Sequence, residues 1–126
     1  MICLDTNYLI LMLIPETAEA RRVKKWLKQG EKLTTSAIAW YEFLCGPVGE
    51  EEIQIVWDCL QGGLIPFEEA QIMEAARLFN AAGRARRLKV DAMIAACAVT
   101  ANIPLATDNQ DDFSAFVGHG LLLMDE

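Results

Sequence analysis

Short apolar runs alternate along the chain with amphipathic segments, and turns rich in polar residues, glycine or proline separate them. Residues 1–4 are continuously apolar and lack the alternation of a strand that faces water on one side. Such a run is typical of an interior parallel strand buried on both faces. Further strands are predicted at residues 32–35, 64–67, 103–107 and 121–124. Pro66 indicates that the third of these five strands is short or lies at an edge.

The segments between the strands are predicted to be helices. Residues 16–29 place apolar side chains on one face and basic side chains on the other. The basic face, Arg21, Arg22, Lys24, Lys25 and Lys28, is interpreted as solvated, with phosphate or partner binding as the alternative. The other predicted helices are residues 6–14, 37–45 (capped by Ser36), 50–60, 68–86 and 92–101, with buried stripes at Ile53, Val56, Trp57 and Leu60 and at Ile72, Ala76 and Phe79. This alternation predicts a single domain, residues 1–126, with an α/β fold: a three-layer α/β/α sandwich around a mostly parallel central sheet.

The composition indicates how much of the surface is covered and in which compartment the domain is expected. The hydrophobic fraction of 53% and the mean hydropathy of +0.21 indicate a tightly buried sheet or a surface covered by a partner. No apolar run approaches the roughly 18 residues that span a bilayer, so a cytoplasmic protein without a membrane segment is expected. The isolated cysteines Cys3, Cys45, Cys59 and Cys97 are expected to be reduced core residues, and His119 to be structural or solvated.

Three carboxylates stand among apolar neighbours: Asp5, Glu42 and Asp91. Each has a structural explanation, because either aspartate can cap a helix and Glu42 can pair with an arginine. All three, with the acidic turn after Thr107, nevertheless lie at or near the carboxyl end of a predicted strand or in the first part of the helix after it, and such positions face one crevice in an open α/β sheet. Carboxylates gathered there raise one another's pKa unless a cation neutralises them, and oxygen ligands without Cys or His select Mg²⁺ or Mn²⁺. The chemistry that this favours is metal-assisted attack of water on a phosphodiester.

The net charge of −7 argues against a general basic coat for nucleic acid, but a bound divalent cation inverts the local electrostatics. Candidate phosphate-binding residues come directly before Asp91: Arg84, Arg86, Arg87 and Lys89. The alternative for this segment is a solvated helix end, where cations suit the dipole. Trp40 and Tyr41 are expected to pack in the core, with stacking on a base as the alternative.

Four stretches in order carry a resemblance to a known family: LDTN at residues 4–7, the isolated Glu42 after SAIAWY, RRLKVDAMIAA at residues 86–96, and PLATDNQDDF at residues 104–113. Across essentially its whole length the chain resembles the PIN-domain ribonucleases, specifically the VapC-type toxins of prokaryotic toxin–antitoxin pairs.

The resemblance implies an endoribonuclease that depends on Mg²⁺ or Mn²⁺ and acts on structured RNA such as tRNA or ribosomal RNA. Asp5 and Asp91 are its implied principal metal ligands, and Glu42 helps to bind metal or to position water. The position of the family's fourth acid is Asn109 here, so Asp108 or Asp112 is left to supply the missing charge. The residues expected to support the site by hydrogen bonds are Thr6, Asn7 and Thr107. A homodimer inhibited by a small antitoxin protein is also implied.

Three other functions are weighed against this one. A phosphatase of the haloacid dehalogenase type needs a second aspartate where Asn7 stands. A phospho-accepting receiver domain needs its acceptor aspartate after the third strand, where the chain has Glu68 and Glu69. A PIN-like fold kept only to bind RNA or protein is the third alternative, and the presence of Asp5, Glu42 and Asp91 argues against it.

Overall fold

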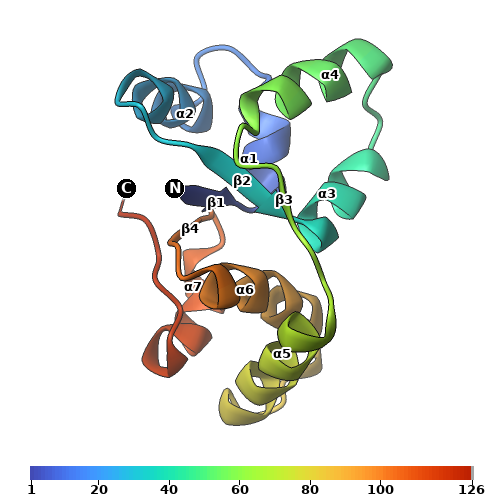
Figure 1. The fold of residues 1–126 in the computed structure, drawn as a ribbon, viewed down its shortest axis with the longest axis vertical. Helices are drawn as coiled ribbons and strands as arrows, with labels where there is room; N and C mark the ends of the chain where they lie inside the picture. Colours follow the sequence, from blue (N-terminus) through green and yellow to red (C-terminus); the bar gives the residue numbers. More distant parts are fainter. Residues whose placement is uncertain (126) are drawn as a thin grey trace.

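A four-stranded parallel sheet forms the centre of the molecule (Figure 1). The computed structural model describes residues 1–125. In spatial order the strands are β3 (Leu64–Ile65), β2 (Leu33–Ser36), β1 (Ile2–Leu4) and β4 (Leu105–Ala106). The mostly parallel sheet is therefore confirmed, with β3 at the predicted edge position.

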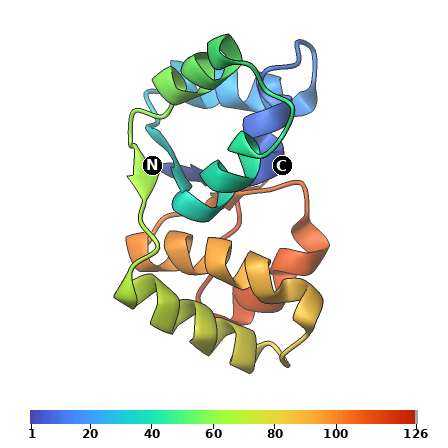
Figure 2. The ribbon, with the colours of Figure 1, turned by 90° about the vertical axis from the view of Figure 1, so that its right-hand side faces the viewer.

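Helices cover both faces of this sheet, so the predicted three-layer sandwich is also confirmed. Figures 1 and 2 show α1 (Thr6–Leu11), α2 (Ala18–Lys28) and α4 (Glu50–Cys59) on one side of the sheet, and α5 (Glu69–Ala81), α6 (Lys89–Ala101) and α7 (Gln110–Phe113) on the other. The remaining helix, α3 (Ala37–Leu44), continues from β2 and contacts both α1 and α6. The alanines of α6 are almost all buried, which allows this helix to lie close to the sheet and to α5.

The strand register determines which residues share the edge where a site is expected. Leu4 of β1 pairs with Thr35 of β2 and with Ala106 of β4. Asp5 and Thr107, which follow the paired Leu4 and Ala106, therefore emerge side by side at the carboxyl edge. Asp5 and Ser36 both cap the helices that begin there, and the Ser36 cap was predicted from the sequence.

The segment between α5 and α6 departs from the prediction. The helix predicted over residues 68–86 ends at Ala81, because Gly83 and Arg84 adopt left-handed backbone angles with φ of 94° and 64°. A 3₁₀ turn, Arg86–Leu88, then leads directly into α6. That helix begins at Lys89, so Asp91 lies in its first turn and the interpretation of Asp91 as a helix cap is wrong.

Several burial predictions are also wrong. The buried face of α5 carries Ala75 and Leu78, whereas Ile72 is exposed, because this helix has apolar residues on two adjacent faces and its periodicity does not choose between them. Trp57 and Cys45 are exposed rather than in the core. All four cysteines, which lie within the described residues, are free.

Two other elements are shorter than predicted, and one turn is more ordered. Helix α1 stops at Leu11 instead of residue 14. The last predicted strand, residues 121–124, contributes only an isolated parallel bridge from Leu123 to Leu105. The acidic turn after Thr107 contains the short helix α7. Within residues 1–125, no helix is long and apolar enough to cross a bilayer.

Candidate functional site

Asp5 is a buried carboxylate at the carboxyl end of β1, with 5% of its surface exposed. Its Oδ1 accepts a hydrogen bond from the backbone N–H of Thr6 at 2.8 Å, and its Oδ2 accepts one from the Thr107 hydroxyl at 2.7 Å. Burial raises the pKa of Asp5, and these two hydrogen bonds oppose that rise because they favour the charged form. The residues that follow two neighbouring parallel strands therefore fix this carboxylate in place.

Thr107 also orders the loop that follows β4. Its hydroxyl oxygen accepts a hydrogen bond from the backbone N–H of Asn109 at 2.9 Å while it donates to Asp5. The backbone N–H of Asp108 donates to the Asn7 side-chain oxygen at 3.4 Å. The loop after β4 is thus bound to the start of α1, and both Thr107 and Asn7 have the supporting contacts expected of them.

Asp91 faces the same space from the first turn of α6. Its pKa is raised to about 6, first by burial and then by the negative charges of Asp5, Asp112 and Glu42. Arg87 partly opposes this rise. The effect of these charges on Asp91 places it in one acidic group with Asp5, Asp112 and Glu42. The four members of this acidic group come from four different parts of the chain.

Glu42 is exposed rather than buried among its apolar neighbours in the sequence. The next residue, Phe43, takes the inward position on α3. Glu42 accepts a hydrogen bond from the Thr6 hydroxyl at 2.7 Å, so its partner is a threonine and not an arginine. Its charge nevertheless raises the pKa of Asp5, and it therefore forms the outer member of the acidic group.

Asn109, at the position of the expected fourth acid, is hydrogen-bonded to Asp112. The Asn109 amide donates to one oxygen of Asp112 at 3.1 Å, and Arg87 donates to the other at 2.6 Å. Asp112 is also one of the charges that act on Asp91. The Asp112 carboxylate therefore adds to the acidic group a negative charge that the neutral Asn109 does not supply.

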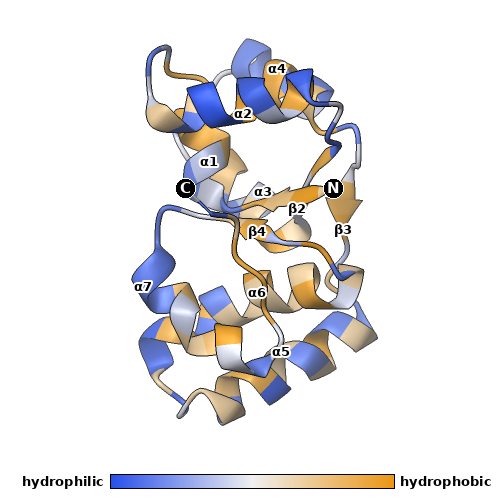
Figure 3. Cartoon of the chain, turned by 90° about the vertical axis from the view of Figure 1, so that its left-hand side faces the viewer, coloured by the Kyte–Doolittle hydropathy of each residue, from blue (hydrophilic) through white to orange (hydrophobic). Residues whose placement is uncertain are grey.

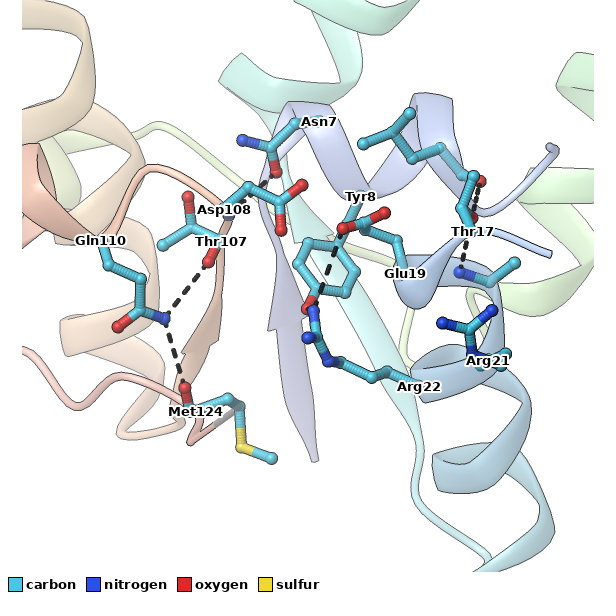
Figure 4. Close-up of polar contacts among 12 residues, drawn as sticks. Asn7, Tyr8, Thr17, Glu19, Arg21, Arg22, Thr107, Asp108, Gln110 and Met124 are labelled. Carbon is cyan, nitrogen blue, oxygen red and sulfur yellow. Dashed lines mark hydrogen bonds and ion pairs between the residues drawn. The ribbon is translucent and has the colours of Figure 1, made fainter. Parts of the chain in front are cut away.

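Asp108 lies in a different direction. Figure 4 shows its carboxylate turned toward Tyr8, and its charge contributes to the raised pKa of that phenol. The buried Tyr8 hydroxyl accepts a hydrogen bond from Arg22 of α2 at 3.0 Å, and Arg22 also lies 3.9 Å from Glu19. This second cluster was missed from the sequence, where Arg22 was assigned to a solvated face. The available signal was Tyr8, because a buried tyrosine needs a partner for its hydroxyl.

The basic segment before Asp91 divides between two places. Arg87 contacts the acidic group through Asp112, and Arg86 is exposed. Lys89 turns away, with its Nζ 5.9 Å from the centre of the Phe79 ring, and borders an apolar groove between α5 and α6 together with Arg84. Only Arg87 therefore touches the acidic group directly.

The aromatic pair beside Glu42 also separates. Trp40 packs against Phe43 and Trp57, with ring centres 5.3 and 5.4 Å apart, as expected for a core residue. Tyr41 is 67% exposed, so its predicted core packing is wrong. The two residues point in different directions because neighbours on a helix lie about 100° apart.

The residues of the acidic group fit a hard divalent cation. They offer carboxylate oxygens, and the pKa of Asp5 and of Asp91 is raised first by burial and then by neighbouring negative charge, both of which a bound cation would offset. Within residues 1–125, no three Asp, Glu, His or Cys side chains converge closely enough to enclose a metal ion by themselves. An open arrangement of this kind suits Mg²⁺, which usually keeps several waters and binds through one or two carboxylates and substrate phosphates.

Comparison with solved structures finds close likeness over nearly the whole chain. The structure of FitAcB from Neisseria gonorrhoeae matches with a TM-score of 0.72 and 22% identity, covering 99% of this chain and 97% of that one. A toxin–antitoxin complex from Klebsiella pneumoniae matches with 0.71 and 23%, covering 90% and 91%. DNA-bound VapBC from Salmonella typhimurium matches with 0.74 and 16%, covering 98% and 96%. At these identities the likeness shows a shared fold.

Sequence comparison gives the family directly. Comparison with curated proteins finds no significant match. The family model for the PIN domain, however, matches residues 2–118. This span includes β1, α6, the loop after β4 and all four members of the acidic group. The chain therefore belongs to the PIN domain family.

Proposed function

We propose that this protein is a metal-dependent endoribonuclease, the toxin of a toxin–antitoxin pair. The observation that carries the proposal is the acidic group itself: buried Asp5 and half-buried Asp91, with Glu42 and Asp112, gathered at the carboxyl edge of a parallel sheet. Several carboxylates held together in this way destabilise one another and are expected where a cation is to be bound.

Each member of the group has a distinct role in this proposal. Asp5 and Asp91 would hold the cation, Mg²⁺ or Mn²⁺, because Asp5 is buried, Asp91 is half-buried and the charge of Asp5 acts on Asp91. At such a site a divalent cation activates water and stabilises charge on the phosphoryl oxygens. Glu42 is exposed and held by Thr6, so it is suited to orient water or to accept its proton.

Asn109 and Asp112 complete the site as a pair. The Asn109 amide holds one oxygen of Asp112, and Arg87 holds the other. Asp112 supplies the negative charge, while Arg87 is available to approach a phosphate beside the scissile one. Arg86 adds a second exposed cation nearby, whereas the direction of Lys89 favours a role in packing.

The partners follow from the family and its solved relatives. Solved structures with this fold include a toxin–antitoxin complex from Klebsiella pneumoniae and a member of the VapBC family of toxin–antitoxin systems from Mycobacterium tuberculosis. We propose that this chain likewise forms a homodimer in the cytoplasm and is inhibited by a small antitoxin protein. Structured RNA, such as tRNA or ribosomal RNA, is the proposed substrate.

A cleavage assay tests the activity. The purified chain, freed of any bound partner, is incubated with total tRNA and ribosomal RNA in Mg²⁺, in Mn²⁺ or in EDTA. Cutting at discrete sites that needs the cation is expected, with loss of cutting in Asp5→Asn and Asp91→Asn.

The matched control is Asp111→Asn. Asp111 is an exposed acid beside Asp112, and within residues 1–125 its side chain makes no hydrogen bond or ion pair with the acidic group. This control is expected to cut as the native chain does. If a folded native chain cuts no RNA with either cation, the protein is a PIN-like binding module rather than a nuclease.

A further inference from the structure

The outer side of α2 gathers the positive charge of an acidic chain. Residues 21–28 contain five of the eleven Lys and Arg residues and no acid, although the whole chain has a net charge of −7. Arg22 turns inward to Tyr8. The other four are exposed and line a shallow hollow on the helix with Gln29: Arg21, Lys24, Lys25 and Lys28. We call these four residues the α2 basic face; Figure 3 shows this helix as strongly hydrophilic along the outside of the molecule.

Acidic side chains do not neutralise this face. Among the residues that the structure describes, Lys24, Lys25 and Lys28 take part in no ion pair. Arg21 donates to the backbone oxygen of Glu16 rather than to a carboxylate. Because successive helical turns are about 5.4 Å apart, the four charges form a row rather than a single point. A row of unpaired cations suits a polyanion, since each phosphate that it neutralises releases condensed counterions.

Helix α2 is linked through α1 to the loop after β4, which leads to Asp112 of the acidic group. Arg22 in the second turn of α2 donates to Tyr8 of α1, and the neighbouring Asn7 accepts from the backbone of Asp108 in the loop after β4 (Figure 4). The far end of α2 leads into β2, which runs parallel to β1 and so begins at the opposite edge of the sheet. With 11 residues, α2 extends about 16 Å between these edges.

We propose that the α2 basic face is a second RNA-binding surface, which holds backbone phosphates of a folded RNA whose scissile bond lies at the acidic group. This inference rests on the proposed nuclease function. Contacts to phosphates position a nucleic acid without reading its sequence. The face therefore selects RNA that is long or folded enough to reach both places.

RNA fits this face better than an acidic protein segment does. Lys24 and Lys28 also border an apolar groove against α4, but Arg21 and Lys25 lie outside that groove. A protein partner gains most of its affinity from apolar anchors in pockets, and the hollow around Arg21 and Lys25 offers no large apolar side chain. Phosphates need only the charges.

Binding of total tRNA tests the proposal. It is measured by fluorescence anisotropy over a range of salt concentrations, in the Asp5→Asn chain so that the RNA stays intact. Lys24→Gln/Lys25→Gln/Lys28→Gln is expected to weaken binding roughly 10- to 100-fold near physiological salt and to reduce the slope of log affinity against log salt by about 2 to 3. The charge-preserving Lys24→Arg/Lys25→Arg/Lys28→Arg variant is expected to retain both. Lys, Gln and Arg are similar helix formers, and circular dichroism checks that α2 is intact.

A cleavage assay with Asp5 intact distinguishes a role of α2 in RNA binding from a role in the chemical step. The Gln variant is expected to cut a short oligoribonucleotide, which cannot reach α2, as well as the native chain does, and to cut tRNA more slowly. An unchanged affinity and salt slope for tRNA would overturn the proposal and would leave the face to an acidic protein partner. A native chain that cuts neither RNA would contradict the nuclease function, whereas the difference in tRNA binding would still decide the role of α2.

Discussion

At the scale of single residues, the site depends on acids that the fold holds against their own electrostatic preference. Asp5 is buried, and its two oxygens accept hydrogen bonds from neutral donors, the backbone N–H of Thr6 and the hydroxyl of Thr107. Asp91 lies close enough to the other acids for its pKa to be raised to about 6. Such strain is a cost to stability that persists where function requires it.

Asp91 gives the protein a pH dependence of stability that runs against the usual direction for an acid. The pKa of Asp91 rises from an ordinary value of 3.8 to about 6 in the folded chain. Between these values the folded state binds more protons than the unfolded state, so stability falls as the pH rises through this window. We expect Asp91→Asn to be more stable than the native chain at pH 7 in EDTA and nearly equal to it below pH 4.

Urea denaturation at a series of pH values measures this difference, with Asp111→Asn as the control. If the difference in the free energy of unfolding between the native chain and Asp91→Asn is the same at every pH, the pKa of Asp91 is not raised in the folded chain.

At the scale of elements, Thr107 couples β1 to the loop after β4. Its hydroxyl donates to Asp5 and accepts from the backbone of Asn109, and its side chain is buried. A valine at this position has nearly the same shape but leaves both groups without their partner. The acidic group depends on this link, because Asn109 and Asp112 lie on the loop that Thr107 orders.

We therefore expect Thr107→Val to lower the free energy of unfolding by about 1–3 kcal/mol, the usual cost of a buried polar group that loses its hydrogen bond. RNA cleavage is expected to fall as well. Thr107→Ser keeps the hydroxyl and is the matched control. Urea denaturation and the cleavage assay on both variants test the coupling; a Thr107→Val variant as stable as the native chain would show that the hydroxyl contributes nothing.

At the scale of the whole molecule, a chain with a net charge of −7 gathers four acids at one edge of the sheet and a row of four cations along α2. A cation that binds the folded state alone stabilises it by mass action, by about 2.7 kcal/mol at a concentration one hundred times its Kd. For a domain of this size, each kcal/mol corresponds to a shift of very roughly 3–6 °C in Tm.

We expect saturating Mg²⁺ or Mn²⁺ to raise the Tm of the native chain and of Asp111→Asn by several degrees. Asp5→Asn and Asp91→Asn are expected to show little rise, because each removes a proposed ligand. Differential scanning calorimetry with and without the cation measures the shift. An equal rise in all four proteins would indicate binding elsewhere on the acidic surface.

Local sequence was sufficient for the architecture and for the inner acids. The apolar run at residues 1–4 requires burial on both faces, which predicts a parallel interior strand, and Asp5 after it must lie at the carboxyl edge. The positions of Asp5 and Asp91 within this α/β alternation were enough to predict that they converge. Caps such as Ser36 were predictable because they depend only on neighbouring residues.

The sequence did not reveal in which direction several side chains point or which faces of the helices meet their neighbours. Exposed Glu42, the inward turn of Arg22, the separate location of Asp108 and the buried face of α5 all depend on which side of an element meets its neighbour. Periodicity defines an apolar stripe but does not choose between two of them, and it says nothing about polar partners far away in the chain. The sequence by itself thus determined the order of strands and helices and the edge at which the acids meet. Only the tertiary structure decided that Asp112 acts on Asp91 while Asp108 turns toward Tyr8, because these directions rest on contacts between residues brought together from distant parts of the chain.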